Sequence, residues 1–259
     1  MTGSAPQGAD ASRSLIDRFV ADGYVRIDEA FPRSIAEECR TILWQATGCS
    51  PDDPNTWTLP VVRLFNHAEP SFRTAAASPV LAAAYDTLVG PDAWQPMVGL
   101  GTFPIRFPST EDPGDDGWHI DAGFNWEAEP DFLKWRVNAD SRGRALLVPF
   151  LFSDVAEHDA PTRIRVGSHT TMAQFLAPFG EQGATLGEIA DSGIVETEHH
   201  PEVLATGNAG TVYLCHPFLV HAAQKHRGKV PKFMAQPPLI PTDPAGPPAD
   251  SIVMRGRLD

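Results

Sequence analysis

From about residue 95 to residue 240, the chain consists of short apolar segments that are separated by loops rich in glycine, proline, aspartate or asparagine. The segments are 97–105, 118–121, 145–155, 163–166, 211–215, 219–223 and 232–239. Many short segments with turn signals between them are typical of a β-sandwich or β-barrel. The 25 prolines argue against a helical bundle, because proline interrupts long helices.

The N-terminal third has a different pattern and predicts helices. We expect a short helix over 14–21 and a strand over 24–27. A second helix is expected from Ser34, whose spacing to Glu37 is that of a capping box, and a third over 78–89.

One domain of 259 residues is ordinary, and helices followed by strands favour a jelly-roll with helices on its N-terminal side. We therefore predict a mainly β fold, with a double-stranded β-helix (cupin-like) core over 95–240 and a mainly helical flank over 13–94. Residues 1–12 are expected to be a flexible tail, and residues 241–259 an irregular one.

Composition excludes several classes of protein. The 33 acidic and 20 basic residues give a net charge of −13, which argues against binding to nucleic acid. The longest apolar run, 145–152, is interrupted by Pro149 and is too short to span a membrane. The first residues do not resemble a signal peptide. Cys39, Cys49 and Cys215 form no CxxC pair, so we expect an acidic cytoplasmic protein without a disulfide framework or a thiolate zinc site.

His119 and Asp121 form the pair of residues most suggestive of chemistry. Residues i and i+2 of a strand point to the same face, so both side chains could reach one metal ion. A histidine from a distant strand would complete the two-histidine, one-carboxylate triad of non-heme iron oxygenases. His221, which follows the segment 210–215, is a candidate for that third ligand.

Two other His-x-Glu pairs compete with this interpretation, and a second histidine competes with His221. In one pair, His200-Pro-Glu202, the central proline disturbs a strand. The other pair, His67-Ala-Glu69, is followed by a proline that suits the start of a helix. His216 is the alternative distal ligand, although proline follows it directly.

Taken in order, these segments resemble the phytanoyl-CoA dioxygenase family of iron(II)- and 2-oxoglutarate-dependent oxygenases. The resemblance covers roughly residues 95–240. It rests on the HxD motif at His119 and Asp121, a Gly-Ser-His turn at 167–169 after Asp-Ala-Pro-Thr, the distal His221, and Lys232 eleven residues later.

The resemblance implies a role for each matching residue. His119, Asp121 and His221 would hold iron(II) and leave sites for 2-oxoglutarate and dioxygen. Lys232 stands where the family usually has an arginine that pairs with the distal carboxylate of 2-oxoglutarate. Lysine is a single mobile charge, whereas arginine is a planar two-pronged donor. Arg227 is the nearest substitute cation.

Further candidates surround this expected site. Arg106, on the strand before the metal loop, is a second candidate for contact with 2-oxoglutarate. Trp118, Arg163 and Arg165 are candidates for the substrate pocket. We expect His169, a residue of the Gly-Ser-His turn, to be hydrogen-bonded to backbone rather than to a metal. The remaining histidines that we expect at the surface are His199, His200 and His226.

The expected function is a dioxygenase that oxidises a small organic molecule and releases succinate and carbon dioxide. Related halogenases have a small residue in place of the carboxylate ligand, so Asp121 favours hydroxylation. The alternative is a metal-binding pocket protein of the same fold without 2-oxoglutarate turnover, such as a sensor or a cupin-like isomerase. The predicted partners are a small-molecule substrate and dioxygen, with no nucleic acid and no membrane. The sequence predicts neither the substrate nor the oligomeric state.

Overall fold

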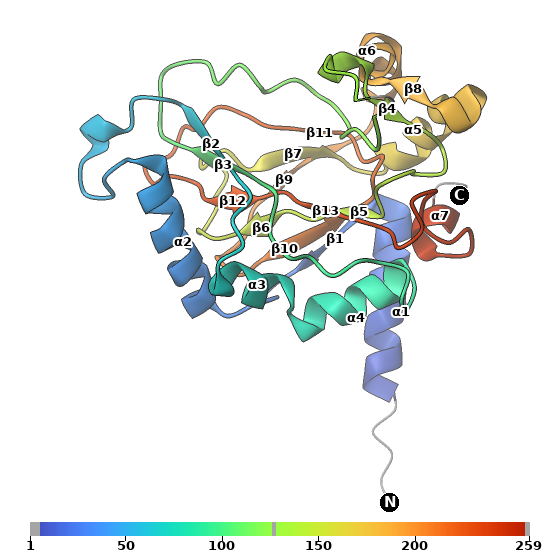
Figure 1. Cartoon of the computed structure of the whole chain (residues 1–259), viewed down its shortest axis with the longest axis horizontal. Coiled ribbons are helices and arrows are strands. Elements are labelled where there is room, and N and C mark those ends of the chain that lie inside the picture. Colours follow the sequence, from blue (N-terminus) through green and yellow to red (C-terminus); the bar gives the residue numbers. More distant parts are fainter. Residues whose placement is uncertain (1–5, 126–127, 257–259) are drawn as a thin grey trace, which may run out of the picture.

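A computed structural model describes residues 6–125 and 128–256 of the chain. Its main sheet is antiparallel, in the order β12-β6-β10-β5-β13, and β1 also pairs with β10 (Figure 1). The bounds of these strands are β1 Tyr24–Ile27, β5 Leu146–Leu147, β6 Phe150–Leu151, β10 Val212–Cys215, β12 Met234–Ala235 and β13 Pro238–Leu239. The expected strand over 24–27 is therefore confirmed, and it joins the main sheet although it precedes the predicted core.

A second antiparallel sheet has the order β11-β7-β9 and lies against the main one. Two further strand pairs, β2 with β3 and β4 with β8, complete the strands. Their bounds are β2 Val61–Phe65, β3 Thr102–Arg106, β4 Arg136–Val137, β7 Thr162–Arg165, β8 Ala184–Thr185, β9 Glu202–Ala205 and β11 His221–Ala222. This arrangement confirms the predicted double-stranded β-helix with flanking helices, although more of the described residues lie in helices than in strands.

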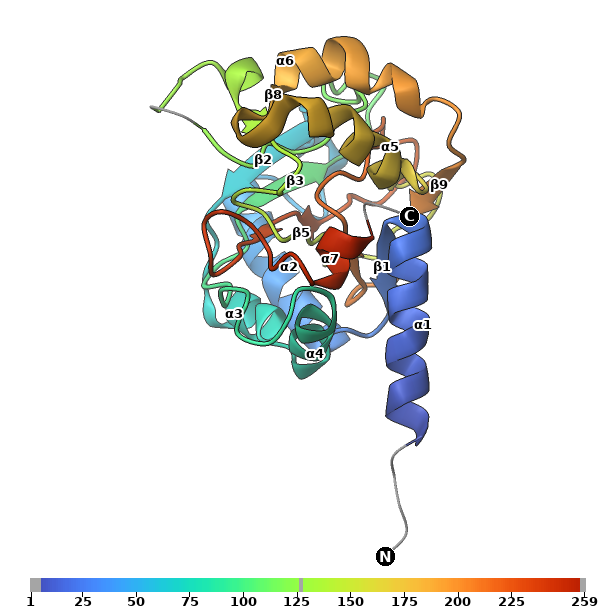
Figure 2. The same ribbon diagram turned by 90° about the vertical axis from the view of Figure 1, so that its right-hand side faces the viewer.

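Four helices from the N-terminal part of the chain cover the outer face of the main sheet (Figure 1). They are α1 Pro6–Asp22, α2 Arg33–Thr47, α3 Pro70–Ala76 and α4 Pro79–Leu88. In the view of Figure 2, α5 (Ser168–Leu176) and α6 (Leu186–Glu188) lie across the opposite end of the molecule from α3 and α4. The remaining helices and helical turns are η1 Pro54–Thr56, η2 Phe132–Lys134, α5 Ser168–Leu176, η3 Ala177–Gln182, α6 Leu186–Glu188, η4 Ile189–Gly193, η5 Val195–Thr197 and α7 Ile252–Arg255. None of the described helices has the length and apolar character needed to cross a membrane.

Strand β10 shows how the two sides of the main sheet are used. Val212 and Leu214 pack into the core beneath the N-terminal helices, whereas Tyr213 and Cys215 pack toward the second sheet. This alternation follows from the two-residue period of a strand. Because both faces are buried, the strand is apolar throughout, which explains why its sequence shows a continuous apolar run.

The ends of the chain and one cap differ from the sequence-based expectation. Helix α1 begins at Pro6, inside the segment 1–12 that was predicted to be a tail. Proline favours the first position of a helix, because its φ is already helical. Helix α2 is capped by Pro32 without a side-chain bond, so Ser34 lies inside the helix and the predicted capping box is wrong. The segment 241–259 contains α7, which is a short helix in a stretch predicted to be irregular.

Candidate metal centre and its cavity

His119 and His221 are brought together by a backbone bridge. The amide of His119 donates to the carbonyl of His221 at 2.9 Å, and the amide of His221 donates back at 3.0 Å. Residues directly opposite each other in an antiparallel pair have adjacent side chains, and the two ring centroids are 4.5 Å apart. The segment 118–121 was predicted to be a strand, but in the structure only this bridge joins it to β11.

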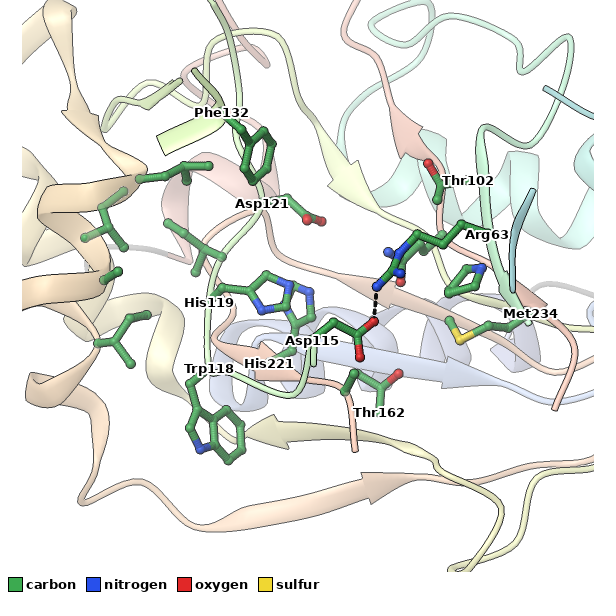
Figure 3. A pocket seen from close by; sticks show the side chains of 18 of the residues that line it. Arg63, Thr102, Asp115, Trp118, His119, Asp121, Phe132, Thr162, His221 and Met234 are labelled. Carbon is green, nitrogen blue, oxygen red and sulfur yellow. Dashed lines mark hydrogen bonds and ion pairs between the residues drawn. The ribbon is translucent and has the colours of Figure 1, made fainter. Parts of the chain in front are cut away.

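Asp121 completes a triad with the two histidines. It lies two residues beyond His119, and one ligand atom from each of the three side chains lies within 4.8 Å of the others. Figure 3 shows the three side chains gathered together. In the part of the chain that the structure describes, no other group of three or more His, Cys, Asp or Glu residues has this geometry. Two imidazoles and one carboxylate are the donor set of the iron(II) facial triad.

Both imidazole rings are oriented by backbone carbonyls. Nδ1 of His119 donates to Gly117 O at 2.9 Å, and Nδ1 of His221 donates to Leu219 O at 3.0 Å. A ring that donates through Nδ1 keeps Nε2 unprotonated, which is the form that binds a metal. Burial, with a smaller effect of His119, lowers the pKa of His221 to about 4. The residues present therefore fit a divalent metal ion at neutral pH.

The Gly-Ser-His turn helps to position His221. Gly167 adopts φ 77° at the N-cap of α5, a conformation that glycine tolerates without strain. The hydroxyl of Ser168 then accepts a hydrogen bond from the amide of Val220 at 2.9 Å. Since Val220 directly precedes His221, the turn fixes the start of β11 and thus the position of the distal histidine.

Arg144 contacts the centre and was missed by the sequence analysis. Its Nη1 lies 3.2 Å from Oδ2 of Asp121, and its Nη2 donates to Ala122 O at 3.0 Å. Burial alone would raise the pKa of Asp121, but Arg144, followed by His221 and His119, outweighs it and lowers that pKa. Asp121 therefore remains a carboxylate and a good metal ligand.

A cavity of about 390 Å³ opens onto the triad. One part of its wall carries Arg63, Arg106 and Asp115. Nη2 of Arg106 donates to Oδ2 of Asp115 at 2.7 Å, and Arg63 pairs with the same oxygen atom (Figure 3). Nη1 of Arg106 and Oδ1 of Asp115 are buried and have no hydrogen-bond partner among the described residues. Such atoms in a cavity wall favour a polar ligand.

Lys232 lies in the same wall and is 2% exposed. Its backbone pairs with Arg106, and its Nζ donates to Ala160 O at 2.6 Å. No carboxylate of the described residues forms an ion pair with it. Burial, then the nearby charge of Arg106, lowers the pKa of Lys232 well below its usual value, and Asp115 opposes this shift only in part. This end of the cavity thus has one carboxylate, Asp115, among three basic side chains, Arg63, Arg106 and Lys232.

A comparison with family models gives one match, to the phytanoyl-CoA dioxygenase (PhyH) family, over residues 19–234. The chain belongs to the phytanoyl-CoA dioxygenase family. The match includes α2, α3 and α4 as well as the segments that hold the triad. It confirms the resemblance that the motifs predicted and places the chain among the iron- and 2-oxoglutarate-dependent oxygenases.

Several solved structures share this fold. The epimerase SnoN, in complex with Fe³⁺, α-ketoglutarate and nogalamycin RO, is 18% identical with a TM-score of 0.60, covering 91% of this chain and 84% of that one. HygX from Streptomyces hygroscopicus, with nickel and 2-oxoglutarate bound, is 17% identical with a TM-score of 0.58, covering 89% and 87%.

EctD from S. alaskensis, in its apo form, is 20% identical with a TM-score of 0.57, covering 95% of this chain and 83% of that one. A search of curated proteins gave no match. At these identities the structural similarity shows the fold that this family member shares with the three proteins. It does not extend to their substrates.

Of the three candidates for the substrate pocket, Trp118 lines the cavity, whereas Arg163 and Arg165 do not. Their guanidinium carbons lie 4.6 and 4.3 Å from the centroid of the Trp118 ring. Because they are two residues apart on β7, both side chains leave the same face of the strand. Arg165 also donates to Ile194 O and to the hydroxyl of Thr197, at 3.0 and 2.8 Å. The two arginines therefore lie outside the cavity, where they hold Trp118, the residue before His119, in place.

Arg165→Ala is expected to lower the free energy of unfolding by about 1.5–3 kcal/mol, the usual worth of hydrogen bonds to a buried charged group. Arg163→Ala should cost less stability, because Arg163 is more exposed and donates to the backbone carbonyls of Ala223 and Asp116. Urea denaturation of both variants measures the difference. Equal stability of the Arg165 variant and wild type would contradict this assignment.

His216, the alternative distal ligand, is not part of the triad. Its Nε2 contacts Val253 O at 3.0 Å, and its Nδ1 accepts from the amide of Phe218 at 3.1 Å. Both ring nitrogens are hydrogen-bonded to backbone, so neither is available to bind a metal. Arg227, the substitute cation considered for 2-oxoglutarate, is exposed and does not line the cavity.

The two rival His-x-Glu pairs also lie elsewhere. His67 pairs with Glu69 at 3.1 Å where α3 begins, as the following proline indicated. His200 contacts Thr171 Oγ1 at 2.8 Å and Val166 O at 2.9 Å, and it is half-buried where the surface was expected. No third metal-binding side chain joins either pair within the described ranges.

The other histidines divide between confirmed and corrected expectations. His169 contacts the backbone at Val20 O, 3.1 Å away, as predicted. His199 is exposed, as predicted. His226 was expected at the surface but is buried, and its Nε2 contacts Val230 O at 2.9 Å. That local bond closes the turn before Lys232 and compensates the histidine for burial.

The depressed pKa of Lys232 gives an expected pH dependence. In the pH range between the folded-state pKa and the usual value near 10.5, the unfolded chain keeps the proton that the folded protein has lost. Unfolding then takes up a proton, so the stability of the ligand-free protein rises with pH over this range, by at most about 1.4 kcal/mol per pH unit.

The comparison that isolates this effect is wild type against Lys232→Met, by chemical denaturation from neutral pH to about pH 10. We expect wild type to gain stability relative to the variant as the pH rises. A difference that stays constant with pH would show that Lys232 keeps an ordinary pKa.

Proposed function

We propose that this protein is an iron(II)- and 2-oxoglutarate-dependent dioxygenase that hydroxylates, or otherwise oxidises, a small organic molecule. The observation that carries the proposal is one cavity with a His-Asp-His triad beside a wall in which three basic side chains share the single carboxylate of Asp115, and the buried Lys232 has no ion-pair partner among the described residues. Family membership supports the same chemistry.

His119, Asp121 and His221 would bind the iron on one face of its coordination sphere. Three protein ligands leave positions for a bidentate cosubstrate and for dioxygen. Bound iron(II), together with 2-oxoglutarate and dioxygen, would supply the oxidant for a C–H bond. The chain's own contribution is to hold the imidazoles in their metal-binding tautomer through Gly117 and Leu219 and to keep Asp121 ionised through Arg144.

Lys232 and Arg106 would bind the distal carboxylate of 2-oxoglutarate. Both are buried in the cavity wall, and Arg106 has a nitrogen without a partner among the described residues. A second negative charge would balance the excess of cations around Asp115. Lysine in place of the family's usual arginine gives a single contact, and Arg106 beside it would provide the second.

Hydroxylation is the outcome that Asp121 favours. A carboxylate on the metal occupies the position that halide takes in related halogenases, so halogenation is disfavoured. SnoN is an epimerase, and SnoK, another protein with this fold, is a carbocyclase, so the fold also accommodates reactions other than hydroxylation. The proposal therefore rests on the ligand set of this chain rather than on those two proteins.

Anaerobic titration with iron(II) and 2-oxoglutarate tests the proposal directly. We expect a weak visible charge-transfer band that needs both components, and succinate release when dioxygen and a substrate from a metabolite panel are added. Iron binding without the band or succinate would overturn the proposal and favour the alternative, a sensor or cupin-like isomerase of the same fold. The cytoplasmic location stays a prediction from sequence.

A further inference from the structure

The cavity wall opposite the cationic residues is apolar. It is built from η2, α6, η4 and the residue that follows η4, which pack together beside α5. The side chains that it contributes to the cavity are Phe132, Leu133, Leu186, Ile189, Ala190 and Ile194. Among the described residues of these elements, no charged side chain lines the cavity.

The triad lies between this apolar wall and the cationic one. Figure 3 shows Arg63 and Thr102 to one side of His119 and Asp121, and Phe132 on the other side of Asp121. Arg63 and Thr102 belong to the paired strands β2 and β3, whereas Phe132 belongs to η2. A molecule that fills both parts of the cavity must therefore be polar at one end and apolar at the other.

Two charged side chains next to the apolar wall, Glu188 and Arg165, have their hydrogen-bond partners outside the cavity. Glu188 of α6 closes a capping box with Thr185, accepting from its amide at 2.8 Å. Arg165 donates to Ile194 O and Thr197 rather than into the cavity. A charged group of a ligand placed against this wall would lose its water and gain no protein partner, which is strongly unfavourable.

The rim of the same wall exposes apolar surface. Phe132 is 57% exposed and Leu133 is 59% exposed, although both line the cavity. Deeper in, Ile189 is 2% exposed and belongs to a packed apolar cluster. Large apolar side chains at the mouth of a cavity that is apolar inside are characteristic of a binding site for an apolar ligand.

We propose that the substrate presents a neutral hydrocarbon surface, an alkyl chain or a fused ring system, to this wall next to the iron site. The cationic wall then serves 2-oxoglutarate. This inference rests on the proposed function and specifies the substrate class of the same site. It disfavours substrates that would place a phosphate, an ammonium or a carboxylate beside Ile189.

The test uses the full chain and a neutral fluorescent probe, N-phenyl-1-naphthylamine, whose emission rises in apolar surroundings. We expect the metal-free protein to bind it, and Ile189→Asp and Phe132→Glu each to weaken binding at least tenfold. Phe132 is largely exposed, so its variant should fold even if the Ile189 variant does not. Val98→Glu is the matched control, because Val98 is 79% exposed and lies outside the cavity.

Competition for the probe then measures the preference for charge. Borneol and bornylamine share one hydrocarbon cage and differ in a hydroxyl and an ammonium group. We expect borneol to displace the probe at least tenfold more effectively from wild type, and Phe132→Glu to reduce or reverse that preference. Equal displacement by both compounds, or equal loss of probe binding in Val98→Glu, would overturn the inference.

Lys232→Met separates this inference from the proposed function. It should need roughly ten- to a hundredfold more 2-oxoglutarate to form the visible band with iron(II), but bind the neutral probe as wild type does. If wild type gives no band while the wall variants still lose the probe, the oxygenase proposal fails and the apolar site stands. If the band forms but Ile189→Asp and Phe132→Glu bind the probe as wild type does, the oxygenase proposal stands and the proposed substrate class is wrong.

Discussion

Alanine at His119, Asp121 or His221 is expected to abolish iron-dependent succinate formation while the protein stays folded. Each substitution removes one of three donor atoms that lie within 4.8 Å of one another. The facial triad binds its metal through all three side chains, so the loss of one weakens metal binding and changes the coordination that the reaction needs. Iron affinity, measured by competition with a chelator, should fall most for Asp121→Ala, because a charged ligand to a dication is lost.

Two histidine variants serve as controls for this result. His199 is exposed, so His199→Ala should leave iron affinity and stability unchanged. His216→Ala should keep iron but lose about 1–3 kcal/mol of stability, since the buried amide of Phe218 loses its acceptor. Loss of iron in His216→Ala with retention in His221→Ala would show that the distal ligand is assigned wrongly.

The motifs predicted the triad because its members follow from backbone periodicity and order along the chain. His119 and Asp121 share a face by strand spacing, and His221 was expected on a later strand. The structure adds the register, since the single bridge between His119 and His221 sets the two rings side by side. The predicted helix over 78–89 also matches α4, whose N-cap is Ser78 and whose first residue is proline.

The contacts that tune the site could not be predicted in the same way. Arg144 reaches Asp121 from a loop, and Asp115 reaches Arg63 from another loop, 52 residues away in sequence. Neither contact follows from helix or strand periodicity, because loop conformation decides it. Arg165 was placed on the correct strand but was predicted to face the substrate pocket. Its side chain contacts Trp118 and Thr197 instead, because tertiary packing decides its direction.

Lys232→Met is expected to raise the apparent constant for 2-oxoglutarate by roughly one to two decades. A charge-assisted contact in a partly desolvated site is worth roughly 1.5–3 kcal/mol, and about 1.4 kcal/mol corresponds to tenfold. Lys232→Arg should do less harm, because it keeps the charge and adds a second donor. Titration of the visible band with 2-oxoglutarate at saturating iron(II) measures both constants.

Lys229 is the matched control, since it is exposed three residues earlier in the chain, and Lys229→Met should shift the constant by less than about twofold. The same small shift in Lys232→Met would mean that its charge does not face the cosubstrate. Two observations argue against that outcome: Lys232 is only 2% exposed, and it has no carboxylate partner among the described residues. A buried ammonium without a counter-ion is unfavourable unless a ligand supplies the negative charge. With iron still bound, such a result would move the anchor to Arg106, and Arg106→Gln would then be the variant in which 2-oxoglutarate affinity falls.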